Sequence, residues 1–469
     1  LEPLSGPMSG YFPLQIRLED LGLKFDDVAS VRVGGVPAIF LQSGAGGVLQ
    51  VTLQGSPREG EAEVELIVDG ESIVLEEIFE YLPPMDPVFE RVVAFGASLT
   101  QGVQRGTPSN HGALMGPASQ LARQFGAYFP LPLLVSDLFP QLEPENIGPP
   151  PECTVASILD IATAGTSAIL PKIQNPDTGA VDFSMARADP HIEVHNVSVG
   201  GSNLRDLIDG PSLTDIPVNF LTHLVYEPFG EFLKPIVETQ LDRVDALKPT
   251  LVVSTDLYGN DLIAPFVNAE IIDVTLATPL EELQPDIVRV VERLAATDAH
   301  IFIANLPAPS LLPVTQEKKR QMLAAAVEGL DDPDEVQAIL DERSAEIDGQ
   351  IAQIDAMAVA CNAHLKEQIE RFPRVYLVDL EVATKVLVGA ELSVGDQILS
   401  SRKFGGLLGL DGVHFSDTGY ALIGNLFINA INKELGLEVP DIDLGVVLAQ
   451  DRESPKSLAE QGINGELCD

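Results

Sequence analysis

From residue 92 onwards, short apolar segments alternate with helical patterns, and this alternation restricts the possible folds more than any other feature of the chain. The strand-like runs lie at residues 92–95, 192–199, 250–254, 300–304 and 375–378. Parallel strands read as near-continuous apolar runs because helices cover both faces of their sheet. The sequence therefore predicts an α/β domain in which a parallel sheet is covered on both faces.

The first 84 residues have a different pattern, in which apolar and polar residues alternate over short segments. Such segments occur at 14–18, 31–33 and 48–53, and a hairpin is indicated where Asp69-Gly70 separates two further runs. Several short strands with glycine-rich turns between them favour a small β-sandwich. The proline-rich residues that follow predict a stiff linker at 85–90.

Residues 313–372 have helical periodicity, and acidic residues around Pro333 indicate the start of a helix. The sharper interpretation of this acidic run is a calcium loop, but it lacks the spacing and the glycine of an EF-hand. A stripe of apolar residues predicts a core-facing helix, with a mobile lid as the alternative. The stripe comprises Ile347, Ile351, Ile354, Met357, Cys361, Leu365 and Ile369. Residues 441–469 show little periodicity, so we expect a loosely packed C-terminal extension.

The chain is strongly acidic, with 28 basic against 70 acidic residues and a formal net charge of −42. This charge repels nucleic acid and anionic membrane surfaces, so neither is an expected partner. No run reaches the roughly 18 apolar residues of a membrane span. The N-terminus has no signal-peptide pattern, which indicates either a cytoplasmic protein or a mature fragment.

The three cysteines have no metal-ligand spacing, and we expect neither a metal nor a cofactor. Cys153 and Cys468 lie in loop-like surroundings, so a disulfide between them is slightly preferred over other pairings, although sequence cannot establish it. Cys361 lies in the helical stripe and is predicted to be a buried apolar residue.

A candidate nucleophile follows the first apolar run, in the sequence Phe95-Gly96-Ala97-Ser98. A serine placed between a strand and a helix start has its hydroxyl at the sheet edge, where backbone N–H groups favour developing negative charge. The alternative role of such a serine is a simple helix N-cap.

A candidate acid and base occur together in Asp411-Gly412-Val413-His414. A carboxylate three residues before a histidine can accept its Nδ1–H, which leaves Nε2 free to take a proton. Among the seven histidines only His414 has this context. His111 is the one rival as base or substrate contact, His191 and His195 lack a third zinc ligand, and His364 is expected to be structural.

Two glycine-containing loops follow later strands and offer hydrogen-bond donors. One is Gly200-Gly201-Ser202, where a backbone N–H could point at an oxyanion, and the other is Gly259-Asn260-Asp261, where Asn260 could donate its side-chain amide. Ordinary turn chemistry is the alternative for either loop alone.

The order of these four motifs resembles the SGNH/GDSL hydrolases over roughly residues 90–435. The resemblance implies a flavodoxin-like three-layer α/β/α sandwich at 91–440. It also implies Ser98 as nucleophile, His414 as base and then acid, and Asp411 as its orienting residue. The oxyanion hole would comprise Ser98, Gly201 and Asn260, with Gly201 preferred over Gly200. The chain departs from the family pattern at Ala97, where Asp is usual, and at Phe415, where Pro is frequent; we expect Phe415 to pack beneath its loop.

Residues 1–84 resemble the IPT/TIG immunoglobulin-like domain, through Gly6-Pro-Met-Ser-Gly10, Val33-Gly-Gly-Val-Pro37 and Phe79-Glu-Tyr81. Such domains are mostly extracellular, so the resemblance implies a secreted or cell-surface bacterial protein. This domain is expected to contact a surface partner or the hydrolase domain.

The SGNH/GDSL resemblance implies carboxylic ester hydrolysis, and apolar loop residues favour a lipid or other acyl ester substrate. These residues are Phe125, Tyr128, Phe129, Leu131, Leu133, Leu134, Leu306, Leu311 and Leu312; if they are core instead, the pocket is smaller. A carbohydrate acetylesterase is a second possibility, although the chain has no Trp for stacking on sugars. A non-catalytic surface adhesion protein with a hydrolase fold is the third.

Overall fold

The computed structural model describes residues 1–44, 46–136, 138–148, 167–175, 178–232, 234–268, 271–463 and 465. The proposed partners Cys153 and Cys468 lie outside the described residues. Cys361 is fully buried, as predicted.

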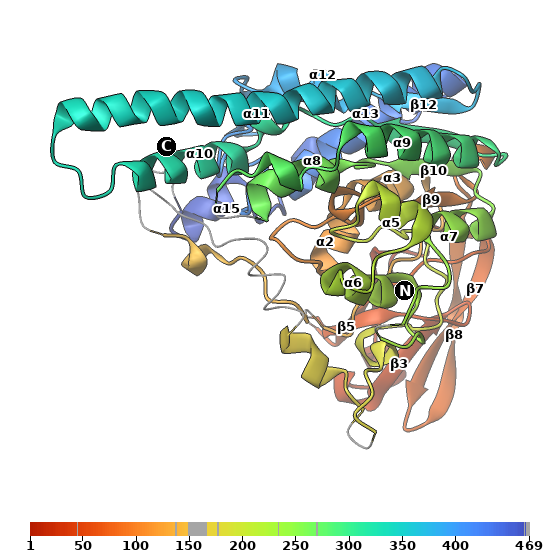
Figure 1. Cartoon of the computed structure of the whole chain (residues 1–469). Helices are drawn as coiled ribbons and strands as arrows, with labels where there is room; N and C mark the ends of the chain where they lie inside the picture. Colours follow the sequence, from red (N-terminus) through yellow and green to blue (C-terminus); the bar gives the residue numbers. More distant parts are fainter. Residues whose placement is uncertain are drawn as a thin grey trace.

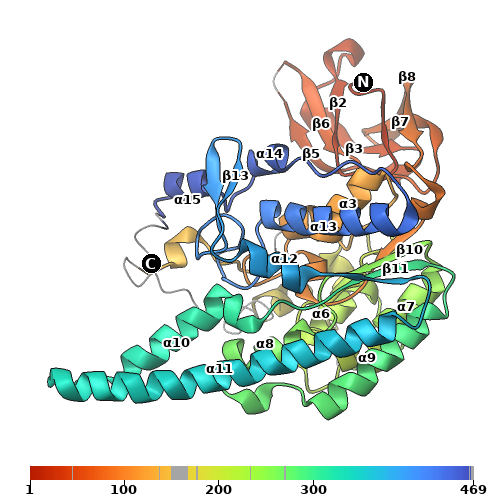
Figure 2. The same ribbon diagram turned by 90° about the horizontal axis from the view of Figure 1, so that it is seen from above.

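The N-terminal region is a two-sheet β structure that lies on one side of the larger α/β part (Figure 2). One sheet has the order β1-β8-β7-β3-β4 and the other β2-β6-β5. The predicted hairpin is confirmed, because β7 and β8 are joined at Asp69 and Gly70, both with positive φ. The strands are β1 Ser5–Pro7, β2 Pro13–Arg17, β3 Val28–Val33, β4 Val36–Pro37, β5 Ile39–Ser43, β6 Val48–Thr52, β7 Gly60–Val68 and β8 Glu71–Leu82.

The larger part contains a parallel sheet of order β12-β11-β10-β9. Its strands are β9 Val92–Ala94, β10 Leu251–Ser254, β11 His300–Ala304 and β12 Val375–Val378, close to the predicted runs. Residues 192–199 are an exception, because they form only a single parallel bridge, from Asn196 to Ala94. Backbone hydrogen bonds still join this run to the end of β9, from Ala94 N–H to the His195 carbonyl, from Val197 N–H to the Ala94 carbonyl and from Val199 N–H to the Gly96 carbonyl.

Two hydrophobic clusters cover the two faces of this sheet. Alternate residues of each strand point to opposite clusters; in β10, for example, Val252 packs into one and Val253 into the other. α3 and α13 lie on one face, and α9 and α11 on the other (Figure 2). The predicted three-layer α/β/α architecture is confirmed.

The helices of the described residues are α1 Ser98–Gln101, α2 Asn110–Met115, α3 Pro117–Phe125, α5 Leu204–Asp209, α6 Ile216–Tyr226, α7 Gln240–Leu247, α8 Gly259–Val267, α9 Leu280–Ala295, α10 Pro313–Ala326, α11 Pro333–Ile369, α12 Leu380–Leu387, α13 Asp417–Leu435, α14 Leu444–Leu448 and α15 Pro455–Glu460. A small hairpin of β13 Leu392–Val394 and β14 Gln397–Leu399 precedes α13. None of the described helices has the length and apolar character needed to cross a membrane.

The α10–α11 hairpin extends past the body of the molecule (Figure 1). Its predicted start is confirmed, because Asp332 caps α11 and Pro333 is the first helical residue. The apolar stripe faces the core: of its seven residues, all are buried except the half-buried Met357. The stripe is therefore part of the main core rather than the surface of a lid.

The C-terminal extension is not loosely packed, contrary to the expectation from its weak periodicity. Asp451, Glu453 and Ser454 are each only 1% exposed, and Leu448 and Leu458 are buried as well. The segment is held by polar contacts and short helices, which leave no long periodic pattern in the sequence.

The β-sandwich and the α/β part share their hydrophobic cores. Ile39 of the sandwich belongs to the cluster beneath α3 and α13, whereas Tyr128 of the α/β part packs against the core of the sandwich. The Tyr11 hydroxyl also accepts a hydrogen bond from the Leu131 backbone N–H at 2.8 Å. The two parts are therefore in direct contact through both apolar and polar groups.

Candidate active site

The predicted nucleophile lies on a tight turn between β9 and α1. Gly96 has φ +138°, and a Cβ at this position would lie 2.8 Å from both an Asp256 oxygen and the Thr100 hydroxyl. Only glycine fits such a crowded, positive-φ position without strain. Ser98 is the first residue of α1 and is half-buried, so its side chain lies at the sheet edge as predicted.

A buried carboxylate, Asp256, holds this turn from the neighbouring strand. Oδ1 accepts hydrogen bonds from the backbone N–H of Ala97 at 3.0 Å and of Thr100 at 3.2 Å, and Oδ2 accepts one from Leu99 N–H at 2.7 Å. The Thr100 hydroxyl donates to Oδ1 at 2.5 Å. Burial raises the pKa of Asp256, although these four hydrogen bonds oppose the rise. Asp256 thus fixes a loop that lacks the family's usual Asp at position 97.

The predicted acid and base form a buried pair before α13. The His414 Nδ1 and Asp411 Oδ2 atoms are 2.7 Å apart, and each residue is 5% exposed. Asp411 Oδ1 accepts the backbone N–H groups of Val413 and His414, both at 2.9 Å. Burial alone would raise the pKa of Asp411, but His414 and these N–H groups outweigh it and hold the pKa below its usual range.

The other ring nitrogen of His414 is directed away from this pair. His414 Nε2 has no hydrogen-bond partner among the described residues, and no hydrogen bond joins it to Ser98. Such bonds are often long in a site without substrate and tighten when substrate binds. The arrangement leaves Nε2 free to accept a proton from a group in the adjoining cavity.

A cavity of about 340 Å³ brings the predicted residues together. Ser98, Gly201, Asn260 and His414 all line it, although they come from four separate stretches of the chain. Asp411 does not line it and lies behind His414. The cavity lies at the carboxyl ends of β9 and β10, where open α/β sheets bind ligands.

The hydrogen bonds around the cavity differ between its two candidate glycines. Gly200 N–H donates to Gln101 Oε1 at 2.9 Å, whereas no described group accepts from Gly201 N–H. Asn260 Nδ2 donates one hydrogen to the Ser202 carbonyl at 2.8 Å, which leaves its second hydrogen available. Ser98 N–H likewise has no acceptor within the described part of the chain.

The apolar lining of the cavity comes mainly from α6, α8 and nearby loops. It includes Val103, Phe139, Val218, Leu221, Ile263, Val267 and Leu276. The loop residues considered for an acyl pocket are not among them, so the structure favours the alternative in which they belong to the core. Phe125, Phe129, Leu131 and Leu133 are instead buried in the hydrophobic cluster that α3 and α13 help to form, and Phe415 packs against Tyr420 of α13.

Two of the other histidines, His111 and His364, have structural surroundings. His111 Nε2 lies 3.0 Å from both oxygens of the buried Asp417, and His111 does not line the cavity. His364 contacts the Gln284 carbonyl, as expected for a structural residue. Within the described residues, no three His, Cys, Asp or Glu side chains are grouped so that they could hold a metal ion.

The sequence reasoning missed two supports of this site. Asp256 could have been found from the sequence, because it is a carboxylate just after the run 250–254. This run forms the strand beside the nucleophile strand. The second support is Gly106, whose N–H donates to Asp411 Oδ2 at 2.7 Å. No spacing rule links Gly106 to a residue 305 positions later.

One family of known proteins matches this chain over most of its length. The family model described as GDSL-like Lipase/Acylhydrolase matches residues 92–427. No curated protein matches. Two solved structures of the plexin A4 full extracellular region are similar at 21% and 18% identity, covering 18% and 20% of this chain. The chain spans only 8% of each plexin, and the TM-score is 0.15 for both structures, which is too low to indicate a shared fold.

The family match covers more than half of the 469 residues and contains Ser98, Gly201, Asn260, Asp411 and His414. The all-β region that precedes it is consistent with an immunoglobulin-like domain. The chain belongs to the GDSL-like lipase/acylhydrolase family, whose general activity is the hydrolysis of esters.

Proposed function

We propose that this protein hydrolyses carboxylic esters through a Ser98–His414–Asp411 triad and an acyl-enzyme intermediate. The observation that carries the proposal is the 2.7 Å contact between His414 Nδ1 and the buried Asp411, with Nε2 unpartnered beside the cavity that Ser98 lines. This contact fixes the ring tautomer that makes Nε2 the basic nitrogen.

In the first half-reaction, Ser98 Oγ forms a bond to the ester carbonyl carbon while His414 Nε2 takes the hydroxyl proton. His414 then gives that proton to the departing alkoxide as the bond to the alcohol breaks, which leaves the acyl group on Ser98. Water repeats the sequence: His414 removes its proton, the water oxygen bonds to the acyl carbon, and Ser98 is reprotonated as the acid leaves. Asp411 remains ionised and stabilises the imidazolium.

The proposed oxyanion hole consists of the Ser98 and Gly201 N–H groups and the Asn260 amide. Each has a hydrogen without an acceptor among the described residues, whereas Gly200 N–H is already bonded to Gln101. This pattern supports Gly201 over Gly200. Donors fixed before the reaction stabilise the tetrahedral oxyanion without reorganisation.

The lining of the cavity supports a neutral acyl ester as substrate. Its apolar residues suit an acyl chain; among the described residues, its lining contains the carboxylates Asp215 and Asp261 but no lysine or arginine. An anionic headgroup would therefore find no partner there and would be repelled.

We also propose a secreted or cell-surface location, supported by the resemblance of residues 1–84 to extracellular IPT/TIG domains.

Labelling with a fluorophosphonate and an ester series from acetyl to palmitoyl tests the proposal. We expect wild-type protein to be labelled and to hydrolyse neutral esters, and Ser98→Ala to lose both properties while remaining folded. Ser109→Ala is the matched control, because Ser109 only caps α2. Labelling that persists in Ser98→Ala would contradict the proposed nucleophile, and a wild-type protein that is neither labelled nor active would contradict the proposed function.

A further inference from the structure

The loop that follows α1 joins the nucleophile to the acid. Gly106 N–H donates to Asp411 Oδ2 at 2.7 Å, and this oxygen is the one that His414 Nδ1 contacts at 2.7 Å. The position of the Gly106 peptide therefore affects both the orientation of the Asp411 carboxylate and its charge density toward His414. Contacts that fix the position of this loop therefore also fix the Asp411 carboxylate.

The residue before Gly106 is a buried arginine. Arg105 is 2% exposed; its Nε donates to Glu453 Oε1 at 2.5 Å and its Nη1 to Glu143 Oε2 at 2.7 Å. The Glu143 side chain is 47% exposed, so its share of the pairing is screened by water, whereas the Glu453 side chain is only 2% exposed. A buried guanidinium that lost Glu453 would keep only a solvated partner, which favours movement of the loop.

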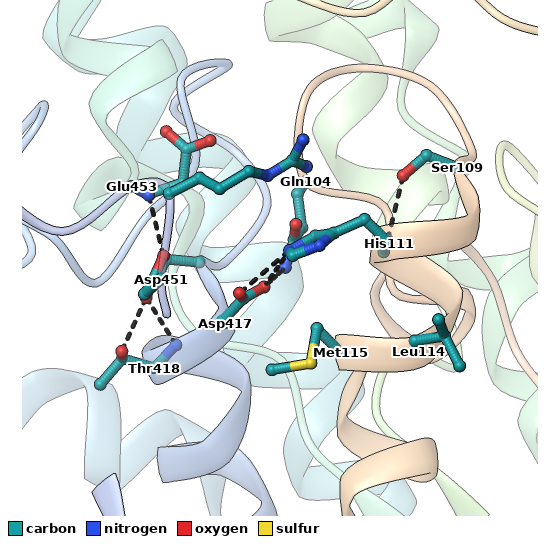
Figure 3. Close-up of polar contacts among 12 residues, drawn as sticks. Gln104, Ser109, His111, Leu114, Met115, Asp417, Thr418, Asp451 and Glu453 are labelled. Carbon is teal, nitrogen blue, oxygen red and sulfur yellow. Dashed lines mark hydrogen bonds and ion pairs between the residues drawn. The ribbon is translucent and has the colours of Figure 1, made fainter. Parts of the chain in front are cut away.

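Glu453 lies in the C-terminal segment, beyond residue 427, where the family match ends. This segment is itself fixed to the base loop. Asp451 Oδ2 accepts the Thr418 N–H at 2.8 Å and the Thr418 hydroxyl at 2.6 Å, and its Oδ1 accepts the Glu453 N–H at 2.9 Å. Figure 3 shows Asp451 between Glu453 and Thr418 at the start of α13. Thr418 follows His414 by four residues, so one short segment braces both sides of the acid–base pair.

A second contact holds the same loop from the α13 side. Gln104 Nε2 donates to Asp417 Oδ1 at 2.5 Å, and Asp417 also accepts from His111 (Figure 3). The Gln104 carbonyl packs closely against Gly409, where a Cβ would lie 2.0 Å from it. The loop is thus clamped on both flanks of Gly106, by Gln104 with α13 and by Arg105 with the C-terminal segment.

We propose that Arg105 and Glu453 are positioning residues for Asp411, so that the C-terminal segment outside the family match is part of the support of the active site. The inference rests on the proposed function, because it requires Asp411 to act on His414. Neither Arg105 nor Glu453 lines the cavity, so neither contacts substrate directly, and the proposed effect on turnover passes through the Gly106 N–H to Asp411. Burial raises the pKa of Glu453 to about 7, which is consistent with a carboxylate enclosed in the fold rather than exposed on the surface.

The test measures kcat and KM separately for Arg105→Ala, Arg105→Lys and Glu453→Gln in the full chain. A misplaced acid lowers kcat and leaves KM within about twofold, and a displacement on the order of 1 Å lowers the rate up to about a hundredfold. We expect Arg105→Ala to lose between about tenfold and about a hundredfold in kcat, and Glu453→Gln somewhat less. Arg105→Lys should recover part of the loss, because its ammonium can still reach Glu453.

Leu49→Ala is the matched control for stability. Leu49 is fully buried in the β-sandwich, so this variant lowers Tm without touching the loop, and we expect its kcat to equal that of wild type well below Tm. Wild-type kcat in folded Arg105→Ala and Glu453→Gln would overturn the inference, as would a rise in KM alone. If Ser98→Ala remained active, the proposed function would fail and this inference with it; an inactive Ser98→Ala beside a fully active Glu453→Gln would overturn this inference only.

Discussion

The two halves of the candidate active site are supported by different parts of the chain. Ser98 lies on a turn whose N–H groups are gathered by one buried carboxylate, Asp256, at the end of the adjacent strand. The acid and base lie on a loop without regular structure, which is braced by Arg105 and by the C-terminal segment. The nucleophile half is thus built into the sheet, whereas the acid–base half depends on contacts between loops distant in sequence. This difference implies that changes near the sheet affect stability and geometry together, whereas changes near the loop affect mainly turnover.

The largest expected effect is on the acid–base half. Asp411→Asn keeps the shape of the side chain but removes the charge that stabilises the imidazolium and selects its tautomer. We expect kcat to fall by roughly 10³–10⁴-fold with little change in KM. Steady-state kinetics with a neutral aryl ester checks this, and a fall of less than about tenfold would show that Asp411 is not the orienting acid.

On the nucleophile half, Asn260→Ala removes one proposed oxyanion donor. The expected loss in kcat is about 10²–10³-fold, with KM nearly unchanged because the developing charge exists only in the transition state. Asn203→Ala serves as the control, since Asn203 also lines the cavity but is not a proposed donor. Equal losses in the two variants would contradict a specific role for Asn260.

Asp256→Ala tests whether the nucleophile half has one shared support, because it removes the carboxylate that holds the turn and leaves the Ser98 side chain unchanged. Four donors of the turn lose their acceptor in a buried site, so the free energy of unfolding should fall by at least about 3 kcal/mol. The rate of fluorophosphonate labelling should fall as well. Urea denaturation and labelling kinetics measure the two effects, and a loss of labelling without any loss of stability would count against a shared support.

The smallest expected effect is on the pH dependence of the free energy of unfolding, through Glu453, which helps to support the acid–base half. The folded-state pKa of Glu453 is about 7, above the ordinary value, so between pH 5 and 7 the folded protein binds its proton more tightly than the unfolded chain does. This contribution to stability is present at low pH and is lost as pH rises through about 7. From pH 5 to pH 8, the free energy of unfolding of wild type should fall relative to that of Glu453→Gln, by at most about 3 kcal/mol.

Urea melts at pH 5, 6, 7 and 8 measure this difference. Arg105 and Arg452 face Glu453 and oppose the rise of its pKa, so they reduce the size of the effect, whereas the neighbouring Asp451 carboxylate raises the pKa further and enlarges it. Glu143→Gln, which removes the exposed partner of Arg105, is the control and should follow the wild-type slope more closely. Parallel curves for wild type and Glu453→Gln would place the titration of Glu453 outside this range.

Much of the fold could be predicted because its strands are apolar runs bounded by turns and its long helix has a periodic face. The runs at 300–304 and 375–378 became β11 and β12 with the same bounds. The run at 192–199 did not become a regular strand, although its backbone is joined to the end of β9 by hydrogen bonds. Periodicity shows which residues are apolar, but it does not show how far the backbone pairing of a strand extends.

The site divides in the same way. The order of the motifs was sufficient to predict that Ser98, Gly201, Asn260 and His414 lie near one another, and all four line one cavity. The Arg105–Glu453 contact could not be predicted, because the two residues are 348 positions apart and an isolated charge carries no signal of its partner. Sequence could not decide between lining and core for a related reason: Phe129 and Leu131 are as apolar as true lining residues, and only packing separates the two groups.

The exchange of Ile39 and Tyr128 between the two cores has a mechanical consequence. Because each domain contributes a side chain to the core of the other, the two domains cannot rotate freely about the proline-rich segment between them. That segment is a fixed connection rather than a flexible linker. A surface bound by the sandwich would therefore be held at a constant angle to the cavity that Ser98 lines.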